Sequence, residues 1–207
     1  MRYLAALFFL TACVTHAPSP VDAAFTERLA PPALTVRFAD PDGLPGAYDD
    51  ALALAVPGGG PRAGYAAQVI EREVAAGIAP RLSAYAGDAS ASLDVEIVDV
   101  ILPDATRFTP LSGQKSFAVA LRLTAPDGAV LAETTRPIVV LSDMQKRGGR
   151  LSGSAWSRLG DTDRLRAEAI LSLAEATARI VGEAMTGGRT QTGLSGGLSA
   201  YPERLPR

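Results

Sequence analysis

Cys13 and His16 are the only cysteine and the only histidine in this chain of 207 residues, and both lie close to its N-terminus. A thiolate is a strong nucleophile and a metal ligand, and an imidazole is the usual general base near neutral pH. Because the residues after His16 include neither group, a Ser-His-Asp triad, a histidine-ligated zinc and a disulfide are excluded there. We therefore expect a domain that needs no cofactor and binds no metal.

Acidic residues form three close pairs that could bind a cation, or share acid-base work, if they converged in a cleft. The pairs are Asp40 with Asp42, Asp49 with Asp50, and Asp161 with Asp163. Asp40 and Asp42 resemble the start of a metal-binding loop, but the later ligands of such a loop are missing. Asp161 and Asp163 are placed to cap a helix. We expect turn and cap roles for these pairs, and we predict no catalytic residue and no enzymatic activity.

A glycine-rich stretch, 58–64, precedes an expected helix and partly fits the G-x-G-x-x-A pattern that brings a pyrophosphate to a helix N-terminus. Pro57 and Pro61 stiffen this stretch, and no repeated βαβ units follow it. We interpret it as the loop that leads into the helix.

Four basic residues surround the only tryptophan in a loop rich in glycine and serine. They are Lys146, Arg147, Arg150 and Arg158, around Trp156. Arginines could contact lipid phosphates or an acidic partner, with the indole as an interfacial anchor. The alternative is a solvated loop whose tryptophan folds onto the core. Lys and Arg number 20 against 22 Asp and Glu, so the chain carries no basic footprint for nucleic acid.

Leu10-Thr11-Ala12-Cys13 follows a short apolar run and resembles the lipobox of bacterial lipoproteins. In that family a signal peptide, here residues 1–12, is removed, and the cysteine then carries a diacylglyceryl thioether and an acylated amine. An aspartate directly after the cysteine often retains such proteins at the inner membrane, whereas this chain has Val14. The resemblance therefore implies a lipid anchor on the periplasmic face of the outer membrane. The alternative is a plain secretory signal. A membrane-spanning helix is not expected, because polar residues end the apolar run soon after Cys13.

The rest of the chain divides into three parts. Prolines among small residues predict that residues 13–33 combine the lipidated cysteine with a flexible tether. Residues 34–187 carry the periodic apolar patterns of one domain. Residues 188–207 have few apolar anchors and are predicted to be a disordered tail.

Within the domain, alternation and helical spacing predict the elements that would position any site. We expect strands at 34–38, 93–102, 117–123 and 130–140, and a helix over 65–85 kinked at Pro80. A last helix is expected to be capped by Asp161 or Thr162 and terminated by Gly187. The run 51–56 is either a strand or a buried loop. A bulge is expected near Ile97, and 125–128 is expected to be a hairpin turn.

The order β-α-β-β-β-α predicts an α+β fold. It would be a two-layer sandwich with a mixed or antiparallel sheet of about four strands and two helices on one face. Together with the lipobox, this order resembles the small auxiliary lipoproteins of proteobacterial envelope assembly and transport complexes. The resemblance implies an accessory or scaffold protein that contacts the membrane through its lipid and binds an envelope protein. The alternative is a periplasmic module that binds a lipid or a small ligand.

Overall fold

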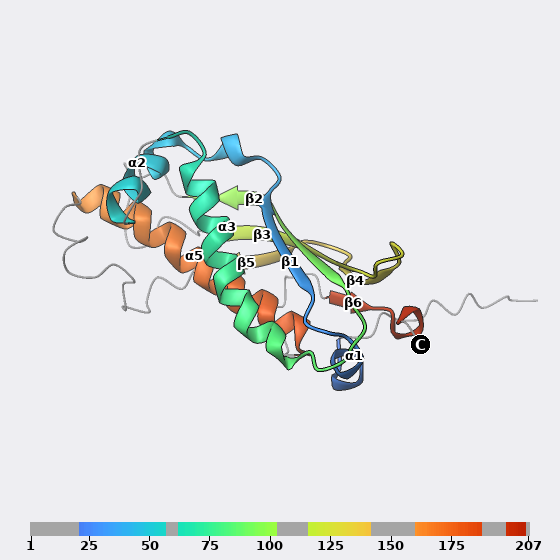
Figure 1. Cartoon of the computed structure of the whole chain (residues 1–207). Coiled ribbons are helices and arrows are strands. Elements are labelled where there is room, and N and C mark those ends of the chain that lie inside the picture. Colours follow the sequence, from blue (N-terminus) through green and yellow to red (C-terminus); the bar gives the residue numbers. More distant parts are fainter. Residues whose placement is uncertain (1–20, 57–61, 103–115, 142–159, 188–197, 206–207) are drawn as a thin grey trace, which may run out of the picture.

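The computed structural model describes residues 21–56, 62–102, 116–141, 160–187 and 198–205. A mixed sheet carries two long helices, α3 (Tyr65–Ile78) and α5 (Asp161–Met185), across one face (Figure 1). The predicted α+β class is confirmed. The predicted strand number is wrong, because the sheet has six strands.

The strands are β1 (Ala33–Phe38), β2 (Ser92–Ile101), β3 (Ser116–Thr124), β4 (Val130–Thr134), β5 (Ile138–Leu141) and β6 (Leu198–Ala200). Their order is β1-β2-β3-β4-β6, with β5 paired to β3. Strand β1 runs parallel to β2, and all other pairs are antiparallel. The remaining elements are α1 (Ala23–Arg28), α2 (Gly46–Ala55) and the short 3-10 turns η1 (Pro41–Gly43), η2 (Ala79–Ala84) and η4 (Pro202–Arg204).

Local signals in the sequence locate several features correctly. The register between β2 and β3 shifts between Ile97 and Asp99, which is the expected bulge. The hairpin from β3 to β4 closes through the Gly128 amide, which donates to the Ala125 carbonyl at 2.9 Å. After Ile78 the chain tightens from α-helix into η2, whose first turn contains Pro80. Proline lacks the amide hydrogen that a continuing α-helix would need there.

Three expected elements differ from the structure. The run 51–56 lies almost entirely in α2, because its apolar side chains meet α5. The expected strand 130–140 is divided into β4 and β5, with Pro137 between them. The N-cap of α5 is Gly160 rather than the expected Asp161 or Thr162.

The predicted flexible tether, 13–33, is wrong for its described part. Helix α1 forms within it, capped by Asp22, whose Oδ1 accepts from the Phe25 amide at 2.8 Å. Val21, Phe25 and Leu29 recur every four residues and are all buried. Phe25 lies within α1, whereas Val21 precedes its N-cap and Leu29 is its extended C-cap. Burial of these three side chains stabilises a segment that the neighbouring prolines would leave extended.

The predicted disordered tail, 188–207, is also wrong for its described part. Strand β6 pairs with β4, and Leu198, Ala200 and Leu205 are buried. Arg204 donates to the Val130 carbonyl at 3.0 Å and lies over the Tyr201 ring. Few apolar residues are enough to order this segment, because its strand pairs with an existing sheet edge and does not have to form a core of its own.

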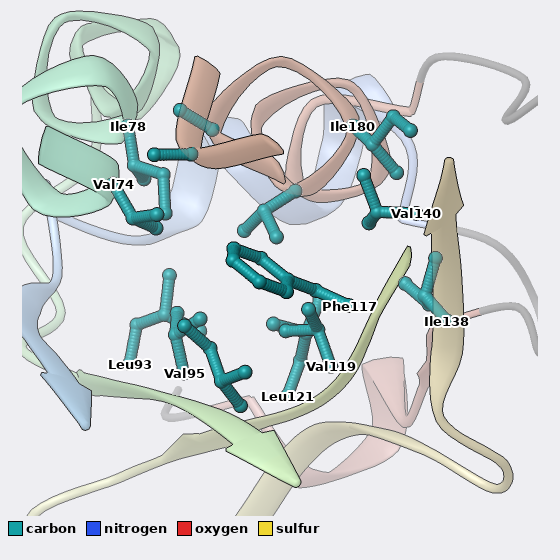
Figure 2. Packing of buried hydrophobic residues seen from close by; sticks show 14 of the residues in the cluster. Val74, Ile78, Leu93, Val95, Phe117, Val119, Leu121, Ile138, Val140 and Ile180 are labelled. Carbon is teal, nitrogen blue, oxygen red and sulfur yellow. The ribbon is translucent and has the colours of Figure 1, made fainter. Parts of the chain in front are cut away.

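The core lies between the sheet and the helices (Figure 2). Alternate residues of β2 and β3 point into it, and Phe117 stands at its centre against the ring of Phe38, 6.1 Å away between centroids. Helices α3 and α5 approach closely where Gly77 meets Ala178. A Cβ atom at Gly77 would lie 2.6 Å from the Ala178 methyl group.

Candidate functional site

The predicted lipidation site and the basic segment around Trp156 lie outside the described residues. They comprise Cys13, Lys146, Arg147, Arg150, Trp156 and Arg158. The structure does describe where the chain enters the domain, the N-terminus of α3 and a free edge of the sheet. The geometry at these three places bears on the hypotheses of a phosphate site and of a partner-binding surface.

The N-terminus of α3 holds a carboxylate of the protein itself. Asp49, from α2, is 8% exposed and accepts the amides of Gly64 and Ala66 at 3.2 and 2.7 Å. Gly64 has a φ of 73°, which glycine adopts without strain. An Asp49 oxygen therefore occupies the position where a bound phosphate would accept these amides, which argues against a pyrophosphate site at the glycine-rich stretch.

Replacing Asp49 with alanine is expected to lower the free energy of unfolding by about 1–2 kcal/mol, because two helix-end amides lose their acceptor. Asp49→Asn keeps one acceptor oxygen and should lose less. Asp50 is the next residue in the same helix and is exposed, so Asp50→Ala serves as the matched control and should stay within about 0.5 kcal/mol. Urea denaturation measures all three variants. Equal midpoints for the Asp49→Ala and Asp50→Ala proteins would contradict this role.

The other carboxylate pairs have local partners or lie in turns. Asp40 and Asp42 lie at η1, where the Asp40 carbonyl accepts the Gly43 amide at 3.2 Å. Asp163 pairs with Arg166 one turn later in α5 at 2.8 Å. Among the residues that the structure describes, no three His, Cys, Asp or Glu side chains gather as a metal ion would require.

Tyr85 is a buried titratable group that the sequence analysis does not single out. Its side chain is 2% exposed, and its hydroxyl donates to the Met185 carbonyl at 2.7 Å. Burial raises the pKa of this hydroxyl well above its ordinary value, because the phenolate would lose its water. The contact satisfies a carbonyl at the C-terminus of α5, so we assign Tyr85 a structural role.

Strand β1 presents one free edge of the sheet; among the described strands, β5 and β6 are also paired on one side only. It pairs only with β2 among the described strands, and the amides of Ala33 and Ala39 donate toward that side at 2.9 and 3.0 Å. Because amide directions alternate along a strand, the N–H and C=O groups of Leu34 and Val36 point away from β2. These outward groups can pair with a further strand.

The end of this edge is closed by a side chain of α3. Glu71 accepts the outward amide of Phe38 at 2.9 Å. On the solvent face of β1, Arg37 pairs with Glu96 of β2 at 3.2 Å. The accessible part of the edge is therefore short and centred on Leu34 and Val36. Sequence alternation indicates the strand, but its edge position depends on long-range pairing that periodicity does not encode.

Comparison with protein-family models, with curated proteins and with solved structures finds no match to this chain. Within the described residues, none of the helices combines the length and the apolar character needed to span a bilayer.

Proposed function

We propose that this chain is a lipid-anchored accessory protein of the bacterial cell envelope, held by Cys13 at the periplasmic face of the outer membrane. It acts by binding a protein partner and catalyses no reaction. The observation that carries the proposal is the lipobox-like sequence ending at Cys13, followed eight positions later by Val21, the first buried residue of the described domain. Several acyl chains on one cysteine give stable attachment, whereas a single chain gives only marginal binding.

Cys13→Ser tests the anchor. The variant is expressed behind a generic cleavable secretory signal in place of residues 1–12, so that export does not depend on the lipobox. We expect the unaltered protein in the outer-membrane fraction, extractable only with detergent, and the variant in the soluble periplasmic fraction. Val14→Asp, with Cys13 intact, should move the protein to the inner membrane, as the lipobox resemblance implies. A Cys13→Ser protein that stays with the outer membrane contradicts the proposal.

The free edge of β1 is the surface that we assign to the partner. An extended segment can add to it through the outward N–H and C=O groups of Leu34 and Val36. The solvent face beside this edge is polar, with Thr35 and Arg37 exposed. Such an edge favours recognition through the main chain, and the charge of Arg37 discourages indiscriminate strand pairing.

A photoreactive amino acid at Thr35, in intact cells, should cross-link the partner. The same group at Arg122, whose side chain is 61% exposed in the middle of the sheet, is the matched control and should not. Val36→Pro removes an outward N–H without breaking a bond to β2, so it should abolish the Thr35 cross-link while thermal unfolding shows a folded domain. Cross-linking that persists in Val36→Pro, or is equal at Arg122, contradicts strand addition.

The alternative function, a module for a lipid or small ligand, would place its ligand between the sheet and the helices. That interface is occupied by core side chains from both layers, including Phe117, Val74 and Ile180 (Figure 2). The packing therefore favours the accessory role over the ligand-binding one.

A further inference from the structure

The N-terminal segment is fixed at one end of the domain from its first described residue. Val21 is 2% exposed, and its carbonyl oxygen lies 2.6 Å from where a Cβ atom of Gly187 would be. Gly187 follows the C-terminus of α5, so the chain enters the fold against that end of the helix. The Asp22 cap and the buried Phe25 then hold α1 in place.

Other segments meet α1 at the same end. The Gly87 amide donates to the Leu29 carbonyl at 2.9 Å, and Arg28 donates to the Leu205 carbonyl at 3.3 Å. We call this region the α1 end, defined by α1, residues 86–89, the last turn of α5 and η4. Figure 1 shows α1 beside the C-terminal turn, with α2 at the opposite end of the domain.

The length of chain between Cys13 and Val21 limits how the domain can sit on a membrane. Eight residues reach at most about 29 Å when fully extended. Helix α5 has 25 residues and is about 37 Å long, and its far end lies beside α2. With Val21 held this close to the bilayer, the domain cannot stand with its α2 end against the lipid.

The exposed large apolar side chains of the described residues lie away from the α1 end. They are Leu54, Ile101 and Leu141, which are 52%, 55% and 43% exposed. Leu54 is in α2, while Ile101 and Leu141 end β2 and β5 and flank Ser116 in one row across the sheet. Strand β2 starts next to α1, so its last residue lies about 30 Å further along.

From this arrangement we infer that the α1 end faces the bilayer to which Cys13 is attached, and that α2 and the ends of β2 and β5 face the aqueous side. The inference rests on the proposed lipidation of Cys13. The occupant of the α1 end is the lipid surface itself, selected by the short connection. The apolar row of Ile101 and Leu141 is thereby presented away from the membrane.

Energy transfer to the membrane surface tests this orientation. Lipidated protein carrying Glu27→Cys or Asp50→Cys is labelled with a donor dye, because the Cys13 thioether leaves the introduced cysteine as the only free thiol. Both positions are exposed, one in α1 and one in α2. The labelled protein is reconstituted in vesicles of phosphatidylethanolamine and phosphatidylglycerol with a headgroup acceptor dye. We expect roughly twofold higher transfer efficiency from position 27 than from position 50, given the lengths above.

Equal or reversed transfer, from protein that floats with the vesicles, overturns the orientation and leaves the anchor standing. Protein that does not float with the vesicles overturns the anchor and the orientation together. Flotation is measured on the same samples, so the two failures are distinguished.

Discussion

Replacing Gly87 with alanine is expected to lower the free energy of unfolding by about 3 kcal/mol and to release α1 from the domain. A Cβ atom at this position would overlap the backbone carbonyl group of Arg28 and would lie 2.6 Å from the Glu27 carbonyl oxygen. No rotamer change relieves such an overlap, because a Cβ position is fixed by its own backbone. The end of α1 must move instead, which breaks the hydrogen bond from the Gly87 amide to Leu29.

Gly46→Ala is the matched control for this change. Gly46 is the first residue of α2, and a Cβ atom there would meet nothing within 4 Å. Alanine at a helix position without steric conflict should leave stability unchanged or raise it slightly. Thermal unfolding compares the two variants, and hydrogen exchange over 23–30 reports whether α1 has been released. Wild-type unfolding and exchange in Gly87→Ala would contradict the close contact.

Phe117→Ala should cost about 3–5 kcal/mol, because the ring fills the middle of the core and its removal leaves a cavity. Phe117 is fully buried on β3, which pairs with β2 on one side and with β5 on the other. Its edge-to-face contact with Phe38 adds a specific aromatic interaction. A large part of the stability of a domain of this size depends on contacts of this kind.

Guanidinium denaturation compares the free energy of unfolding of Phe117→Ala with that of two further variants, Phe117→Leu and Arg122→Ala. Leucine keeps much of the buried volume and should cost less than alanine. Arg122 is on the opposite face of the same strand and pairs with Glu133 at 3.3 Å on the surface, so its truncation should change stability by less than about 1 kcal/mol. A Phe117→Ala protein as stable as Arg122→Ala would contradict the position of the core.

The predictable parts of the fold are those set by neighbours in sequence. Alternation and a turn with glycine at its fourth position are enough to predict the hairpin through Gly128. A change in apolar parity is enough to predict the bulge beside Ile97. Both depend on contacts that strand pairing makes between close or adjacent segments, so local pattern and final structure agree.

The elements that the sequence predicts wrongly are those whose structure depends on contacts with distant segments. The sequence of α2 shows only a short apolar run and does not predict a helix. Packing against α5, more than a hundred residues later, selects the helical state. Phe25 and Leu29 look isolated among prolines in the sequence, because their segment is held by backbone hydrogen bonds from segment 86–89 to Thr26, Arg28 and Leu29. Strand β6 has three residues, and only the open edge of β4 gives it a partner.

The candidate sites also divide into those that local sequence predicts and those that only the fold shows. A capping role for the acidic pairs follows from composition, but the helix that Asp49 caps begins 16 residues later and could not be named from the sequence. The free edge of β1 needs the whole strand order. The proposed anchor, by contrast, rests on four consecutive residues that end at Cys13, so the sequence alone is enough to predict it.

The mass of the mature N-terminus tests the anchor most directly. Protein extracted from membranes with detergent is digested with trypsin, and the first peptide of the mature chain, which ends at Arg28, is analysed. We predict a peptide that begins at Cys13 and carries a diacylglyceryl group on its sulfur and an acyl group on its amine. A mature chain that begins at another residue, or a Cys13 with a free thiol, contradicts the account.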